Sequence, residues 1–191
     1  MLDAEAILAA TEDVLRRYGP AKATVVDVAR ALDVSHAAVY RHFPSKAALR
    51  EAVIRRWLGR GLEHLVGIAE DPRVPPPARL RAWLVAMSAA KQAKVREEPE
   101  LFATYKRLAE EHSEVAAEFA GGLIAQLRTI VDDGIASGDF SARDGAATTR
   151  TVFEATALFH YPAFAEAWLA DDINARLEAV CDVLLDGLRA R

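Results

Sequence analysis

Apolar residues recur at helical spacing along nearly the whole chain, and signals of β-strands are almost absent. In the first segment, one helical face carries Ile7, Leu8, Val14, Leu15 and Tyr18. The chain has no sustained period-two alternation, and no Asn-Gly or Asp-Gly hairpin joins strand-like runs. The pattern therefore predicts an all-α fold.

Capping and breaking residues divide this pattern into separate helices. Asp3 is the expected N-cap of the first helix, and Gly19-Pro20 is its expected stop. Thr24 and Asp27 have the spacing of a capping box, and Pro44 ends the helix that Ser35 begins. The further helices are expected at about 25–32, 36–43, 46–69, 77–96, 99–111, 114–137, from Ser141 or Asp144 to 160, 163–169 and 172–188.

Length and composition exclude several classes of protein. The 191 residues are 52% hydrophobic and 27% charged, which is typical of a globular protein and excludes a disordered chain. No uncharged stretch is long enough to cross a membrane. Asp3 and Glu5 at the start exclude a secretory signal, and the single cysteine, Cys181, fits a reducing compartment. We therefore expect a cytoplasmic protein.

Motifs of enzymes and of metal sites are absent. The sequence contains no dinucleotide-binding glycine motif, no P-loop, no Gly-x-Ser-x-Gly elbow and no His-Glu-x-x-His. The five histidines and one cysteine do not have the spacing of zinc ligands. We expect no catalytic residues, no metal and no cofactor.

Charge is distributed unevenly along the chain. The net charge is −4, but residues 1–60 carry ten basic and seven acidic side chains, whereas residues 61–191 carry 14 basic and 21 acidic ones. Parts of opposite charge indicate two different tasks.

Residues 24–43 have the pattern of two short helices joined by a tight turn, Leu32-Asp33-Val34-Ser35. That length is typical of a helix–turn–helix unit, whose second helix enters the major groove of DNA. On a helical wheel, His36, Ala37, Tyr40 and Arg41 face outward, whereas Ala38, Val39, His42 and Phe43 face inward. From the pattern alone, an ordinary helical hairpin with a polar surface remains the alternative.

The run from Thr24 to Leu49, and above all Val39-Tyr40-Arg41-His42-Phe43-Pro44-Ser45-Lys46, closely resembles the TetR family of bacterial transcriptional regulators. The resemblance covers about residues 4–55. It implies an N-terminal three-helix helix–turn–helix DNA-binding domain at 1–46 and a helical ligand-binding and dimerisation domain at 47–191, with the long helix 46–69 connecting them.

The resemblance also implies a set of DNA-contacting residues. Those residues are Thr24, Val25, Ser35, His36, Ala37, Tyr40, Arg41, His42 and Lys46. His42 conflicts with the helical wheel, and we follow the family motif. Two positions depart from the family pattern: Asp33 stands where glycine is common in the turn, and Val26 stands where many relatives are polar or basic. Either departure would weaken DNA binding.

For the C-terminal domain, the resemblance implies an internal pocket between helices. The candidate lining residues are Trp83, Met87, Phe102, Tyr105, Leu127, Phe153 and His160. An apolar pocket with Tyr105 and His160 as polar groups would bind a small hydrophobic or aromatic effector. The alternatives are that most of these aromatic residues form ordinary core and that His160 caps a helix end.

The last helix carries an apolar seam of Ile173, Leu177, Val180, Leu184 and Leu188. In this family, the helices near 144–159 and 172–188 of two subunits would form a homodimer interface, which suits a two-fold operator. The seam could instead pack within its own domain. We interpret Cys181, beside the seam, as a small buried hydrophobe.

Together these features predict a ligand-responsive repressor that binds a palindromic operator on double-stranded DNA as a dimer and is released by an effector. Effector binding would move the helix at 46–69 and so alter the spacing of the recognition helices. Two rivals remain: an activator of the same fold, and a ligand-sequestering protein whose DNA-binding domain is vestigial.

Overall fold

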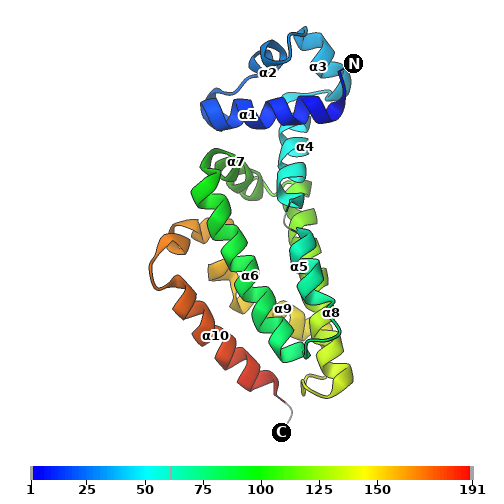
Figure 1. Ribbon diagram of the computed structural model, residues 1–191, viewed down its shortest axis with the longest axis vertical. Coiled ribbons are helices and arrows are strands. Elements are labelled where there is room, and N and C mark those ends of the chain that lie inside the picture. The colour runs from blue at the N-terminus through cyan, green and yellow to red at the C-terminus, as the bar shows by residue number, and fades with distance from the viewer. Residues whose placement is uncertain (1, 61, 190–191) are drawn as a thin grey trace. The chain divides into compact units, whose positions relative to one another are not determined.

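The computed structural model of the protein describes residues 2–60 and 62–189, and every regular element in these ranges is a helix (Figure 1). The α-helices are α1 (Ala4–Lys22), α2 (Val25–Ala31), α3 (His36–His42), α4 (Lys46–Gly59), α5 (Leu62–Ala69), α6 (Pro76–Glu97), α7 (Pro99–Glu110), α8 (Glu114–Ser137), α9 (Gly145–Ala155) and α10 (Ile173–Leu188). Two 3₁₀ segments, η1 (Ala157–Phe159) and η2 (Pro162–Leu169), lie between α9 and α10. The predicted all-α fold is confirmed.

Contacts divide the chain into two units that are not continuous in sequence. The first contains residues 1–60 and 96–119, and the second contains residues 61–95 and 120–191. Helices α6 and α8 each contribute to both units. The boundary expected at residue 46 separates a DNA-binding domain from a ligand-binding domain by function, whereas these units are defined by contacts. The functional boundary stays a prediction.

In the first unit, α1 packs against α2, α4 and α7, and α2 packs against α3. The core of this unit takes apolar side chains from every one of these helices. It includes Ile7, Val14, Leu15, Val28, Val39, Leu49, Val53, Trp57, Leu101 and Leu108. The short helices α2 and α3 are therefore held by burial of one face each, because helices of seven residues are marginal on their own.

The N-caps predicted for the first unit are confirmed. The Asp3 side chain accepts a hydrogen bond from the Ala6 backbone N–H at 2.8 Å. Thr24 and Asp27 form a complete capping box, and Ser35 caps α3 in the same way. The stop at Gly19 is also real, because Gly19 has φ 70° and ψ 166° inside the segment Ala4–Lys22. An L side chain there would be strained, and its Cβ would lie 2.7 Å from a carboxylate oxygen of Glu100.

The single helix expected at 46–69 is wrong. Helix α4 ends at Gly59, and Arg60 has an extended backbone with ψ 118°. Glycine favours helices poorly, and the sequence has Gly59 and Gly61 on either side of Arg60. Arg60 in turn binds the Glu12 carboxylate with two nitrogens, at 3.0 and 2.9 Å. The break therefore combines weak local propensity with a contact to a residue 48 positions away.

In the second unit, polar contacts join α6 to its neighbours. Arg79 donates to the Ala69 carbonyl at the end of α5 and pairs with Asp133 of α8, at 2.7 and 2.8 Å. The Trp83 indole donates to Gln126 of α8 at 2.9 Å. None of the described helices is both long and apolar enough to cross a membrane.

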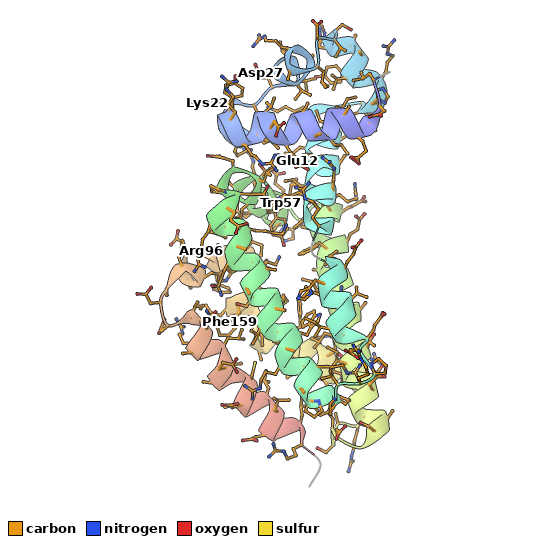
Figure 2. All side chains as sticks on the ribbon, in the orientation of Figure 1. Glu12, Lys22, Asp27, Trp57, Arg96 and Phe159 are labelled. Atoms are coloured by element: carbon orange, nitrogen blue, oxygen red, sulfur yellow. The ribbon has the colours of Figure 1, made fainter. Side chains whose placement is uncertain are left out.

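The helix expected from 144 to about 160 is shorter than predicted. Asp144 is its N-cap, and α9 ends at Ala155. The Thr156 hydroxyl bonds to the carbonyl of Val152 at 2.9 Å, and the chain then continues as η1. That segment buries Phe159, which is labelled in Figure 2.

Candidate nucleic-acid interface and ligand pocket

The turn between α2 and α3 is closed by a two-bond C-cap with Asp33 at its centre. Asp33 N–H donates to the Arg30 carbonyl at 3.2 Å, and Val34 N–H donates to the Ala29 carbonyl at 3.0 Å. This pair of bonds is a Schellman motif, which requires a left-handed residue at the position of Asp33. Asp33 has φ 53°, so the turn forms in the conformation expected of a helix–turn–helix unit.

Helix α3 exposes one polar face and buries the other. Ala38 and Val39 are buried against the unit, and the outward candidates are all exposed. The exposed candidates are Ser35, His36, Ala37, Tyr40, Arg41 and His42, together with Thr24 and Lys46 at the starts of α2 and α4. The rings of His36 and Tyr40 meet edge to face, with 6.3 Å between their centroids. Guanidinium, imidazole and phenol groups on one face can donate to base edges and phosphates.

Two candidates differ from their expected placement. The helical wheel puts His42 on the inner arc, which is wrong, because His42 is exposed near the end of α3. Val25 is only 7% exposed, so it offers little surface for the predicted contact with DNA. Contact with DNA stays a prediction for the whole set.

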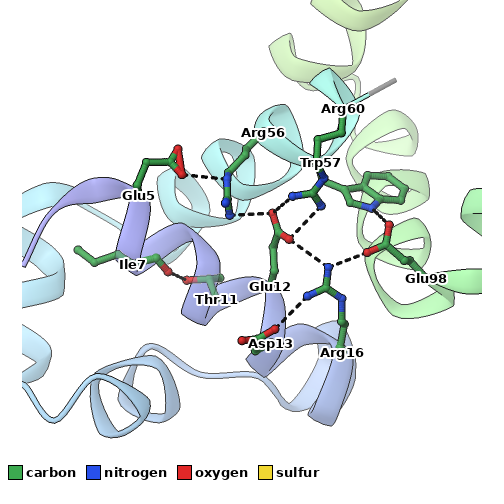
Figure 3. Close-up of polar contacts among 10 residues, drawn as sticks. All are labelled: Glu5, Ile7, Thr11, Glu12, Asp13, Arg16, Arg56, Trp57, Arg60 and Glu98. Atoms are coloured by element: carbon green, nitrogen blue, oxygen red, sulfur yellow. Dashed lines mark hydrogen bonds and ion pairs between the residues drawn. The ribbon is translucent and has the colours of Figure 1, made fainter. Parts of the chain in front are cut away.

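A buried carboxylate ties α1 to α4 beneath this surface (Figure 3). Glu12 of α1 is 3% exposed and accepts from Arg56 at 3.1 Å and from both terminal nitrogens of Arg60. Arg16, one turn along α1, approaches the same carboxylate at 3.1 Å. Figure 2 labels Glu12 and Trp57, which both belong to this junction.

A second carboxylate continues the network to the start of α7. Glu98 accepts from Arg16 at 2.7 Å and from the Trp57 indole at 2.5 Å. Although burial opposes this effect, these donors lower the pKa of Glu98 below its usual value. Glu12 and Glu98 thus fix three helices of the first unit relative to each other.

The predicted pocket residues do not all lie in one unit. Trp83, Met87 and Leu127 are fully buried in the second unit, where Phe153 and His160 also lie. Phe102 and Tyr105 belong to the first unit. Tyr105 there contacts the rings of Trp57, Phe102 and Phe119, with centroids 5.9 to 6.3 Å apart. These ring contacts fit the alternative of ordinary core packing, and a contact of either residue with an effector stays a prediction.

His160 has the structure of a helix-end cap. Its Nε2 lies 2.9 Å from the carbonyl oxygen of Phe153 in the last turn of α9, and the two rings lie 4.2 Å apart. A carbonyl only accepts, so Nε2 carries the proton. Burial lowers the pKa of His160 to about 4.

Lys91 was not among the residues predicted from the sequence, and it is almost completely buried, at 4% exposure. Burial, with a smaller effect of the positive charge on Lys94, lowers the pKa of Lys91 to about 7. The signal was present in the sequence, because Lys91 follows Trp83 and Met87 at intervals of four residues on α6.

Helices α9 and α10 form an open groove of about 320 Å³ with small and aliphatic walls. Its lining is Ala147, Thr148, Thr151, Val152, Val183, Leu184, Gly187 and Leu188. Of the predicted seam, Ile173 and Leu177 are buried in the second unit, whereas Val180, Leu184 and Leu188 are only partly buried. Val183, which is not part of the predicted seam, is 74% exposed.

Two family models match the sequence. Residues 7–53 match a model described as bacterial regulatory proteins, tetR family, and residues 76–181 match one described as tetracyclin repressor-like, C-terminal domain. No curated protein matches the sequence.

Solved structures with the same fold cover nearly the whole chain. The TetR family regulator PfmR from Thermus thermophilus is 25% identical, with a TM-score of 0.59 over 96% of this chain and 98% of that one. A TetR regulator from Haloarcula marismortui is 21% identical, with a TM-score of 0.71 over 97% of both chains. FadR from Bacillus subtilis, solved with stearoyl-CoA, is 16% identical, with a TM-score of 0.66 over 98% of this chain and 100% of that one.

Proposed function

Because this chain belongs to the TetR family of bacterial regulatory proteins, we propose that it represses transcription by binding a palindromic operator as a dimer. Proteins of this family are transcription factors and not enzymes. The observation that carries the proposal is the exposed face of α3, which places Ser35, His36, Ala37, Tyr40 and Arg41 above a buried helix–turn–helix core.

On this proposal, α3 enters the major groove and the starts of α2 and α4 contact the backbone. Arg41 and the exposed imidazoles donate to base edges or phosphates, and Lys46 pairs with a phosphate. The two half-sites lie about 34 Å apart, or a multiple of that distance, because the protein dimer has two-fold symmetry. Binding weakens steeply with added salt, because phosphate contacts release counterions.

The dimer forms, on this proposal, through α9 and α10 of two copies. Support comes from the open groove between these helices and from the exposed Val183 and partly exposed Leu184 and Leu188. The small residues of α9 allow a helix of the partner to approach closely.

The effector binds in the second unit, near Trp83 and Met87. It is a small molecule with an apolar or aromatic body. By linkage, an effector that releases the operator binds the DNA-free form more tightly than the DNA-bound form.

Tyr40→Ala tests the proposed interface. We expect operator affinity to fall by about tenfold, because one good contact to DNA contributes about 1–3 kcal/mol. The measurement is a gel-shift titration with DNA from upstream of the chain's own gene. Tyr18→Ala is the matched control, since Tyr18 and Tyr40 are both 41% exposed and Tyr18 is not among the predicted contacts.

Unchanged affinity of Tyr40→Ala would refute the assignment of α3 as the recognition helix. A wild-type protein that shifts no upstream fragment at low salt would instead support the vestigial DNA-binding domain.

A further inference from the structure

A small pocket opens in the first unit, between the end of α1, the start of α2 and the first turns of α4. Its volume is about 40 Å³, which is room for about three groups the size of a methyl or a water molecule. Ala23, which follows the kink of α1 at Gly19, contributes only a methyl group to the wall. The buried aliphatic wall includes Val14, Leu15, Ala23, Val28 and Leu49. The pocket is therefore suited to a short aliphatic group.

Two cationic side chains of α4 also line the pocket. Lys46 and Arg50 are four residues apart, so they lie on the same face of α4. The other polar residues of the lining, Thr11 and Thr24, donate their hydroxyls within their own segments. The charged donors at the pocket are therefore those of Lys46 and Arg50.

Arg50 holds a buried donor that the first unit does not use. Its terminal nitrogen Nη2 donates to Glu111 at 2.6 Å, whereas its Nε is buried and has no hydrogen-bond partner among the described residues. Glu111 also accepts from Arg107 at 3.0 Å, so one carboxylate serves two guanidinium groups. Lys46 is exposed and makes no ion pair within the described part of the chain. A buried N–H without a partner is costly, and an anion that accepts from it removes this cost.

We propose that this pocket binds a short aliphatic carboxylate, whose tail of about three carbons fills the apolar part while the carboxylate accepts from Arg50 Nε and from Lys46. The site is separate from the effector site proposed near Trp83 and Met87, because every lining residue belongs to the first unit. Its effect on DNA rests on the proposed function, since Lys46 is one of the predicted phosphate contacts. A carboxylate paired with Lys46 competes there with the operator backbone.

An NMR titration of the full chain, with isotope-labelled valine methyl groups, measures both the affinity and the place of binding. The probes are acetate, butanoate and 1-butanol at millimolar concentration. We expect butanoate to bind about tenfold more tightly than acetate, since each buried methylene contributes about three- to fourfold. It should also bind about tenfold more tightly than 1-butanol, which lacks the charge.

The methyl signals that shift should be those of the lining residues Val14, Val25 and Val28. Butanoate that shifts none of these signals, or that binds no more tightly than acetate and 1-butanol, overturns the proposal.

Ala23→Val tests the apolar part of the pocket. The substitution fills the pocket and keeps both cations, and φ −58° with ψ 129° at Ala23 is close to the extended region that valine adopts readily. We expect butanoate binding to fall by at least about fivefold, because the tail no longer fits. Ala9→Val is the matched control, since Ala9 is exposed on α1 and outside the lining. If Ala23→Val unfolds thermally like the wild type and binds butanoate unchanged, the pocket is not the site.

Arg50→Lys tests the buried donor. Lysine keeps a positive charge that can pair with Glu111 but has no Nε–H group, so the preference for butanoate over 1-butanol should fall by at least about fivefold. Arg55→Lys is the matched control, because Arg55 is another arginine of α4 that pairs with a glutamate, Glu118, and lies outside the lining. An Arg50→Lys protein with the full preference overturns the role of Nε.

Operator titrations with and without butanoate separate this inference from the proposed function. Sodium chloride at equal ionic strength is the control for sodium butanoate, because DNA binding weakens with any salt. We expect butanoate to weaken operator binding of the wild type more than chloride does, and Ala23→Val to respond equally to both. If the wild type binds no DNA, the repressor proposal fails, and the NMR titration still decides the pocket. Butanoate that fills the pocket and acts on operator binding only as chloride does overturns the competition at Lys46.

Discussion

Asp33 occupies a left-handed backbone position that glycine adopts without cost. The Schellman bonds of Asp33 and Val34 require a left-handed backbone there, and Asp33 has φ 53°. This conformation costs an L-residue about 1–2 kcal/mol, and aspartate tolerates it better than most residues. Asp33 is also exposed, beside the predicted DNA-contacting face. One residue therefore affects both the stability of the turn and the charge that faces DNA.

Two substitutions separate these effects. Asp33→Asn removes the charge and keeps a side chain at the strained position, so we expect about twofold tighter operator binding with stability unchanged. Asp33→Gly adds relief of backbone strain, so the free energy of unfolding rises by up to about 1 kcal/mol. Urea unfolding and a DNA titration measure the two effects. If Asp33→Gly is no more stable than Asp33→Asn, strain at this position is negligible.

At the scale of helices, the Glu12 carboxylate links α1 to the end of α4. Its partners Arg16, Arg56 and Arg60 keep 30 to 45% of their side chains exposed, whereas the carboxylate keeps 4%. Removing one member of a fully buried pair costs about 3–5 kcal/mol, and exposure of the arginines reduces that value. We expect Glu12→Gln to lower the free energy of unfolding by about 1–3 kcal/mol in urea.

Glu5→Gln is the matched control for Glu12→Gln. Glu5 pairs with Arg56 at 3.0 Å on the same face of α1, but its side chain is 69% exposed. Exposed pairs contribute about 0–1 kcal/mol, so this variant should unfold close to the wild type. Equal losses in the two variants would mean that burial of the Glu12 carboxylate has no special role.

Local sequence signals predicted well where helices start, but they did not predict the contacts between helices. The capping box of Thr24 and Asp27 is a property of four adjacent residues, so the sequence reveals it. The end of α4 depends also on Arg60 reaching Glu12 of another helix, so local spacing did not predict it. Lys91 was missed because a lysine in a helix is usually exposed.

The candidate functional site shows the same difference between local features, which the sequence predicted, and contacts between helices, which it did not. The exposed face of α3 was predicted from spacing and family motif, apart from the buried side chain of Val25. For the candidate ligand residues the sequence predicted burial but not neighbours, since an aromatic side chain signals burial without saying which residues it contacts. Their contact with an effector stays a prediction. Phe102 and Tyr105 are buried as expected of aromatic residues, but they meet Trp57 and Phe119 in the first unit.

For the whole molecule, an operator of two half-sites requires two copies of the chain. The α9–α10 groove leaves an aliphatic side chain, Val183, 74% exposed, and burial of such a residue contributes about 1.5–3 kcal/mol. In a two-fold interface each substitution acts twice, since both copies contribute the same surface. A charge at Val183 is therefore expected to oppose dimerisation strongly.

We expect Val183→Glu to sediment as a monomer at micromolar concentration, where the wild type sediments as a dimer. Its operator affinity should fall by at least about tenfold, because a monomer binds one half-site at a time. Val26→Glu is the control for oligomeric state, since Val26 is also an exposed valine, at 54%, but belongs to α2. It should remain dimeric. A dimeric Val183→Glu protein would place the interface on another surface, and a monomeric wild type would exclude dimeric operator binding at that concentration.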